Sequence, residues 1–101
     1  MVEERYVVVW NKTARTQVRN IYNYIAKDSL QNAKKVVEGI VQSTNQLEIN
    51  PERFAKDKYK QNNDGTYRYY ELYNYRIVFR IYKNHIRIIR LRSTHQEPKD
   101  Y

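Results

Sequence analysis

Cysteine is absent from this chain of 101 residues, so disulfides and thiolate metal sites are excluded. No apolar stretch approaches the roughly 20 residues that a transmembrane helix needs, so we expect no contact with a membrane. The N-terminal stretch lacks a basic region followed by an apolar region and a cleavage site, so we expect no signal peptide. These absences favour a cytoplasmic protein, and the length predicts a single domain over residues 1–101 with a modest core.

Acidic residues are scarce in the second half of the chain. The formal net charge is +8, but residues 1–52 hold 7 Lys/Arg and 6 Asp/Glu, a balance of +1, whereas residues 53–101 hold 12 and 5, a balance of +7. Seven of the 11 tyrosines lie between Tyr59 and Tyr82. Because cations hold phosphates and aromatic rings stack on unpaired bases, this composition favours a surface for single-stranded nucleic acid or the ribosome. The alternative is that tyrosine is simply a good strand residue.

The first half of the chain predicts one strand and two helices. Residues 5–10 are short, β-branched and bounded by polar residues, which is typical of a strand. Apolar or small residues recur with helical spacing over 14–25 and again over 30–47, and Asn50-Pro51 ends the second helix. Gly39 within that helix costs about 1 kcal/mol relative to alanine, which suggests close packing against the first helix.

The second half predicts a loop and three strands. Residues 52–66 are polar and contain the turn signal Asn63-Asp64-Gly65. Strands are expected at about 67–72, 75–82 and 85–93. The element order is therefore β-α-α-β-β-β. It predicts an α+β fold in which a helical hairpin packs on one face of a mainly antiparallel four-stranded sheet and leaves the other face open and basic.

The two hairpin turns set which side chains share a face. A turn at Lys83-Asn84 gives a core face and an open face by strict alternation. The core face holds Ile77, Phe79, Ile81, Ile86 and Ile88; the open face holds Arg76, Val78, Arg80, Tyr82, His85, Arg87, Ile89, Leu91 and His95. If Tyr73-Asn74 is the other turn, Glu71 lies opposite Arg76, and Tyr67 and Tyr69 share the open face. A slip of one residue would move all three to the other side.

Three features of the chain point to a known family: the element order, the strand Tyr75–Arg80 (YRIVFR), and the strand Ile86–Leu91 (IRIIRL), which runs into Thr94–Pro98. In these features the chain resembles the RelE/ParE superfamily of toxins from bacterial type II toxin–antitoxin systems. The resemblance covers nearly the whole chain. It implies a ribosome-dependent mRNA endoribonuclease that acts without metal or cofactor and inhibits translation. The alternative is the ParE branch, which inhibits DNA gyrase without nuclease activity. A third possibility is an inactive toxin that only binds its antitoxin.

The resemblance also implies residue roles on the open face. Arg76 matches an arginine that contacts phosphate, and its alternative role is a salt bridge to Glu71. His95 and Tyr101 occupy positions of acid/base residues in the tail, although His95 could instead tie the tail down and Tyr101 could be a frayed terminus. Glu71 is a candidate general base, or only the partner of Arg76.

Further cations are expected to position RNA by contacting phosphate or ribosomal RNA. They are Arg68, Arg80, Arg87, Arg90 and Arg92 on the strands, and Lys56, Lys58 and Lys60 in the loop. Arg68 fits this role less well, because alternation points it toward the helices. In every branch of the superfamily a small antitoxin neutralises the toxin. We therefore expect an acidic antitoxin as partner, beside the ribosome and mRNA or DNA gyrase.

Overall fold

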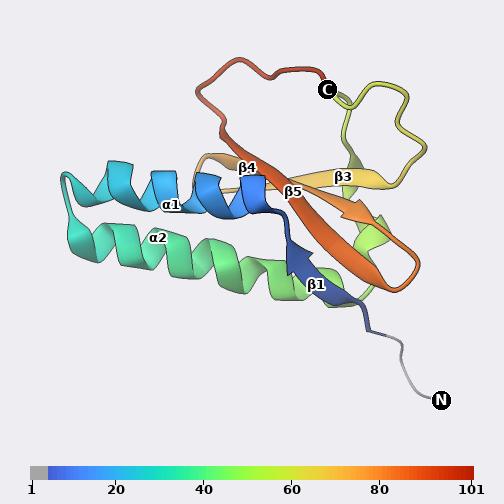
Figure 1. Ribbon diagram of the computed structural model, residues 1–101, viewed down its shortest axis with the longest axis horizontal. Coiled ribbons are helices and arrows are strands. Elements are labelled where there is room, and N and C mark those ends of the chain that lie inside the picture. Colours follow the sequence, from blue (N-terminus) through green and yellow to red (C-terminus); the bar gives the residue numbers. More distant parts are fainter. Residues whose placement is uncertain (1–4) are drawn as a thin grey trace.

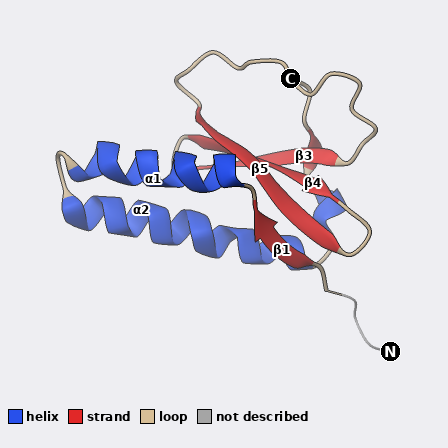
Figure 2. Ribbon diagram, viewed as in Figure 1, coloured by secondary structure: helices blue, strands red, loops and turns tan. Residues whose placement is uncertain are grey.

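The predicted order of elements is present in the computed structural model, which describes residues 5–101 (Figure 1). A hairpin of two helices packs on one face of a twisted sheet, as expected for the α+β class (Figure 2). The elements are β1 (Val7–Trp10), α1 (Lys12–Ala26), α2 (Leu30–Ser43), the 3-10 helices η1 (Thr44–Glu48) and η2 (Pro51–Arg53), β2 (Ala55–Lys56), β3 (Tyr67–Leu72), β4 (Tyr75–Ile81) and β5 (His85–Ser93).

The sheet has five strands in the order β1-β5-β4-β3-β2, so the prediction of four was one too few. The extra strand is β2, which has only two residues, both exposed, and pairs with β3 at Tyr69 and Arg68. A polar strand this short carries no apolar alternation that a sequence pattern could detect. β1 runs parallel to β5 and every other pairing is antiparallel, which confirms a mainly antiparallel sheet.

The helices bury one stripe each, as their spacing predicts. Ser29 caps α2, because its side chain accepts a hydrogen bond from the Asn32 amide at 3.0 Å. α2 ends at Ser43 rather than near residue 47, and the chain continues as the tighter η1. Leu47 still enters the core from η1. The fully buried apolar core joins both helices to β4 and β5 through Ala14, Ile40, Leu47, Ile77, Phe79, Ile86, Ile88 and Leu91. Between residues 5 and 101, no helix has the length and apolar character needed to cross a bilayer.

A bulge in β5 reverses the faces of its second half. Ile86 and Ile88 pair with Ile81 and Phe79 as predicted, but Arg90 then pairs with Val78, so Ile89 has no partner of its own on β4. One extra residue shifts alternation by one position. The prediction that Leu91 lies on the open face is therefore wrong, because Leu91 is 3% exposed in the core. Arg90 and Arg92 move to the open face instead.

The hairpin turn at Tyr73-Asn74 has the expected position. Both residues have left-handed backbone angles, with φ of 53° and 65°, as a two-residue hairpin turn requires. The turn places the Tyr73 ring against α2, and a Cβ added to Gly39 would lie 2.6 Å from that ring. Gly39 therefore gives room to Tyr73, not to the first helix as its position in the sequence suggested.

We predict an interaction between substitutions at Gly39 and Tyr73. Alanine at residue 39 gains about 1 kcal/mol of helix propensity, but it must displace the Tyr73 ring. Asparagine at residue 73 removes the ring and tolerates the left-handed turn. Gly39→Ala should therefore stabilise the Tyr73→Asn protein by about 1 kcal/mol and the wild type by clearly less. Urea unfolding of the four proteins measures both differences, and equal gains in the two backgrounds would contradict the close contact.

Candidate binding site on the open face

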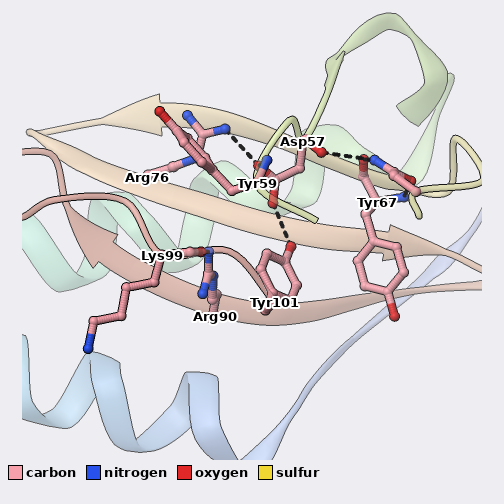
Figure 3. Close-up of polar contacts among 8 residues, drawn as sticks. Asp57, Tyr59, Tyr67, Arg76, Arg90, Lys99 and Tyr101 are labelled. Carbon is pink, nitrogen blue, oxygen red and sulfur yellow. Dashed lines mark hydrogen bonds and ion pairs between the residues drawn. The ribbon is translucent and has the colours of Figure 1, made fainter. Parts of the chain in front are cut away.

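The open face is organised around the carboxylate of Asp57, which follows β2 and has a fully buried side chain (Figure 3). One oxygen accepts from Nη2 of Arg76 at 2.8 Å and from the Tyr59 amide at 3.2 Å. The other accepts from the Tyr101 hydroxyl at 2.5 Å. Burial raises the pKa of Asp57, but the hydrogen bonds from Tyr101 and Arg76 outweigh burial and hold that pKa below its ordinary value.

Asp57 is held in place by the turn that the sequence predicted around Asn63. The Asn63 amide group donates to the carbonyls of Asp57 and Tyr67 at 3.0 and 2.9 Å. Its oxygen accepts from the amides of Gly65 and Tyr67. Gly65 has φ of 95°, a conformation that favours glycine. The loop from Asp57 to Tyr67 is thus fixed by one side chain at its two ends.

Arg76 is held by contacts within the chain. Its guanidinium lies 3.4 Å from the ring centroid of Tyr69 and 4.8 Å from that of Tyr59, and its side chain is 12% exposed. Glu71 is its cross-strand neighbour, as the predicted register requires, but the ion pair forms with Asp57. The suggested partnership with Glu71 is therefore replaced by one with a loop residue that strand alternation cannot identify.

Tyr101 is firmly attached, not a frayed terminus. Its ring centroid lies 3.8 Å from the Arg90 guanidinium carbon, and its edge packs on Tyr67. Its amide donates to the Tyr59 carbonyl at 3.0 Å, and its own carbonyl accepts from the Gln61 amide at 2.7 Å. Burial raises the pKa of Tyr101, and the neighbouring Asp57 carboxylate raises it further. The hydroxyl is therefore protonated, and its proton is directed at Asp57.

His95 lies apart from this cluster. It is exposed and lines a groove of about 820 Å³ beside α1, together with Gln17 and Tyr24. Strict alternation placed it on the open face with Arg76, but the bulge at Ile89 and the turn after Ser93 send it to the α1 side. The structure thus brings Arg76 and Tyr101 together through Asp57 and leaves His95 outside the cluster.

A smaller pocket of about 260 Å³ opens over the Arg76 end of the face. Its charged lining residues are Lys58, Arg76, Arg90 and Arg92 against one carboxylate, Glu71. The Nε atoms of Arg76, Arg90 and Arg92 are buried without a hydrogen-bond partner among residues 5–101. Four cations against one carboxylate make the pocket suited to an anionic group.

The remaining predicted cations lie at three other places. Arg68 points to the helix side, and its guanidinium donates to the carbonyls of Gly65, Glu52 and Phe54. Arg80 and Arg87 are opposite each other as predicted. Arg80 stacks on Tyr67 and Tyr82, and Arg87 donates to Asn11. Lys56 is exposed on β2, and Lys60 donates to the carbonyls of Gln61 and Tyr101.

Sequence reasoning missed Asp57, the residue on which the cluster depends. The one signal was an aspartate between Lys56 and Lys58 in a basic segment, which by itself is typical of a solvated loop. Nothing local indicates that β2 carries this carboxylate under the tail. In the part of the chain that the structure describes, no group of three or more His, Cys, Asp or Glu side chains is placed to hold a metal ion.

Comparisons with known proteins agree with this architecture. Residues 8–98 match the model of the family described as ParE toxin of type II toxin-antitoxin system, parDE. A solved structure of the chromosomal ParDE system from P. aeruginosa is similar, with a TM-score of 0.69 and 21% identity, over 87% of this chain and 95% of that one. The structure of the RelBE2 toxin–antitoxin complex from Mycobacterium tuberculosis is also similar, with a TM-score of 0.62 and 18% identity, over 89% of this chain and 92% of that one. No curated protein sequence matches the chain.

We predict that Asp57→Asn lowers the free energy of unfolding by about 1–3 kcal/mol at neutral pH, because it leaves the buried Arg76 without its counter-charge. The folded-state pKa of Asp57 is lowered, so its contribution is present above the ordinary value of 3.8 and is lost as pH falls through the folded pKa. Wild type and variant should thus converge in strong acid.

Urea unfolding between neutral and acid pH measures this difference. Asp28→Asn is the matched control, since that aspartate is exposed between the two helices, and its effect should stay small at every pH. A gap between wild type and Asp57→Asn that does not change with pH would contradict the ion pair.

Proposed function

The chain belongs to the ParE toxin family of type II toxin–antitoxin systems, and from this premise we propose that it acts by binding and inhibiting DNA gyrase. Its activity in this proposal is molecular recognition without nuclease chemistry. We place it in the cytoplasm, where gyrase acts, and we propose a cognate antitoxin as its natural partner. The alternative of an mRNA endoribonuclease, which the resemblance to the RelE/ParE superfamily first implied, takes second place.

The observation that carries the proposal is the state of the acid/base groups. Metal-independent RNA cleavage needs an accessible base for the ribose hydroxyl and an accessible acid for the leaving oxygen. Both oxygens of Asp57 are occupied by groups of the chain itself. The Tyr101 proton is directed at Asp57, and a raised pKa makes Tyr101 a poor acid. The contacts among Arg76, Asp57 and Tyr101 therefore suit a role in stabilising the fold better than a role in catalysis.

The same contacts suit a rigid docking surface. Cations and tyrosine rings alternate across the open face, from Tyr69 and Arg76 at one end to Tyr82 and Arg80 at the other. Rings and guanidinium groups that are already packed lose little conformational freedom when a partner binds. A surface with this charge attracts acidic protein surfaces and the phosphates of DNA. A complex of gyrase with DNA offers both.

One observation favours the second candidate, a metal-independent mRNA endoribonuclease that depends on the ribosome. Arg76, Arg90 and Arg92 line one pocket, and their guanidinium groups suit a phosphate. The free acid/base groups would then be Glu71, which is exposed at that pocket, and His95, which is exposed and whose side chain makes no hydrogen bond within residues 5–101. This candidate makes His95 essential, whereas the gyrase proposal makes it dispensable.

The decisive experiment compares the wild type with His95→Ala and Arg92→Gln. As a gyrase inhibitor, the purified wild type should block supercoiling and accumulate cleaved gyrase–DNA complexes. His95→Ala should keep this activity within about twofold, and Arg92→Gln should lose about tenfold, equivalent to ~1.4 kcal/mol of binding. Arg19→Gln, at an exposed arginine of α1, is the matched control for lost charge and should match the wild type.

Mapping mRNA 5′ ends after brief induction of the same proteins tests the competing candidate. Intact messages together with trapped gyrase support the proposal. Cleavage inside codons of translated messages, abolished in His95→Ala, would overturn it in favour of the endoribonuclease. Normal growth and active gyrase with the wild type would point to a toxin that only binds its antitoxin.

A further inference from the structure

β5 extends well beyond the strand that flanks it. β1 pairs only with residues 85–88 of β5, whereas β5 continues to Ser93 (Figure 1). At Asn11 the chain donates a last hydrogen bond to the Ile88 carbonyl at 3.0 Å and then turns into α1. The β1 side of residues 89–93 therefore has no neighbouring strand within the described chain. An open sheet edge of this kind is a template for another strand.

The alternation of the β4–β5 ladder shows which main-chain groups face this edge. The Thr94 amide donates to the Asn74 carbonyl of the β4 side, and the Leu91 amide donates away from β4 to the Gln17 side chain at 2.6 Å. In an antiparallel ladder the direction alternates, so Ser93 faces the same way as Leu91. The Leu91 carbonyl and the Ser93 amide make no hydrogen bond within residues 5–101, although the Ser93 carbonyl accepts from Gln96.

This edge forms one wall of the 820 Å³ groove beside α1. The volume is in the range of about 300–1,000 Å³ that is usual for ligand clefts. α1 contributes Gln17, Ile21 and Tyr24 to the opposite wall. None of the residues that line the groove is acidic, while Arg92 supplies a cation and His95 an imidazole. The groove therefore joins an open main-chain edge to a positive, partly apolar lining.

We propose that the β5 edge at Leu91–Ser93 binds an extended acidic segment of a protein partner, which adds a strand where β1 has ended. The partner's main chain donates to the Leu91 carbonyl and accepts from the Ser93 amide, as in other cases of strand addition. Residues 89 to 93 of β5 lie beyond the end of β1, so a segment that runs along them spans about five residues, or roughly 16 Å, and pairs through the Leu91 carbonyl and the Ser93 amide.

The two faces of the added strand meet different surroundings. Alternate side chains of a strand point to opposite faces of the sheet. One set faces the helix layer, where Ile21 and Tyr24 line the groove, and apolar residues fit there. The other set faces the side of Arg92, where carboxylates fit. The site therefore selects a segment in which apolar and acidic residues alternate.

The proposal deepens the toxin–antitoxin assignment by locating a partner segment, and it does not depend on whether gyrase is the target. It differs from the docking surface proposed above, because it uses the sheet edge beside α1 and not the Asp57 cluster, although Arg92 lines the hollows on both sides. Its test measures peptide binding directly. A protein that fails to inhibit gyrase could still bind the peptide, and a protein that fails to bind the peptide could still inhibit gyrase, so the two proposals fail separately.

The probe is a synthetic peptide of alternating valine and glutamate, about seven residues long so that it covers the open edge. Titrated into the full chain, it should shift the backbone NMR signals of Leu91 and Ser93 and slow hydrogen exchange at the Ser93 amide. A peptide with glutamine in place of glutamate should bind about tenfold more weakly at low salt. Shifts confined to Arg76, Arg80 and Arg87, or no shifts at millimolar peptide, would overturn the proposal.

Ser93→Pro and Ser93→Ala form a matched pair. Proline removes the outward amide proton without removing a ladder bond to β4, a position where strands tolerate proline. Alanine keeps that proton and removes only the hydroxyl, which accepts from the His95 amide. Peptide affinity should fall at least about tenfold in Ser93→Pro and change less than about twofold in Ser93→Ala. Equal affinities in the two variants would refute main-chain pairing, and a dispersed spectrum for Ser93→Pro establishes that the variant is folded.

Discussion

One buried carboxylate controls the basic half of this molecule. Asp57 has a fully buried side chain in a chain of net charge +8, and it binds Arg76 from β4, the Tyr59 amide from its own loop and Tyr101 from the tail. A buried charge is tolerated only when partners compensate it, so each of these groups fixes the others. Three segments far apart in the sequence are thereby held in one arrangement, and the tail is closed over the open face.

The second constraint is the single extra residue in β5. The bulge at Ile89 turns Leu91 into the core and brings Arg90 and Arg92 to the face that already carries Arg76. Without it, the two arginines would point into the helix layer, where no counter-charge could be expected from the apolar stripes. The pocket lined by three arginines thus depends on a local backbone irregularity, which is a frequent use of bulges near functional sites.

The two constraints together support the proposed function in recognition. Of the groups that an endoribonuclease would use, Arg76 and Tyr101 are occupied through Asp57, and His95 is displaced toward α1, while Glu71 is exposed at the pocket beside Arg76. What stays accessible is a patterned surface: a positive pocket on one side of β5 and an open main-chain edge on the other. A toxin that must be held by an antitoxin and also reach a target has use for two such surfaces.

The sequence by itself determined the α+β class, the helical hairpin, both strand turns and the pairing of Glu71 with Arg76, because these follow from local periodicity and turn chemistry. Tertiary structure alone decided the rest. β2 is too short to show alternation, the bulge at Ile89 lies within an unbroken apolar-basic strand pattern, and Asp57 meets Tyr101 across 44 residues. Charge composition located the basic half of the chain, but only packing could show which of its charges neutralise one another and which remain open to a partner.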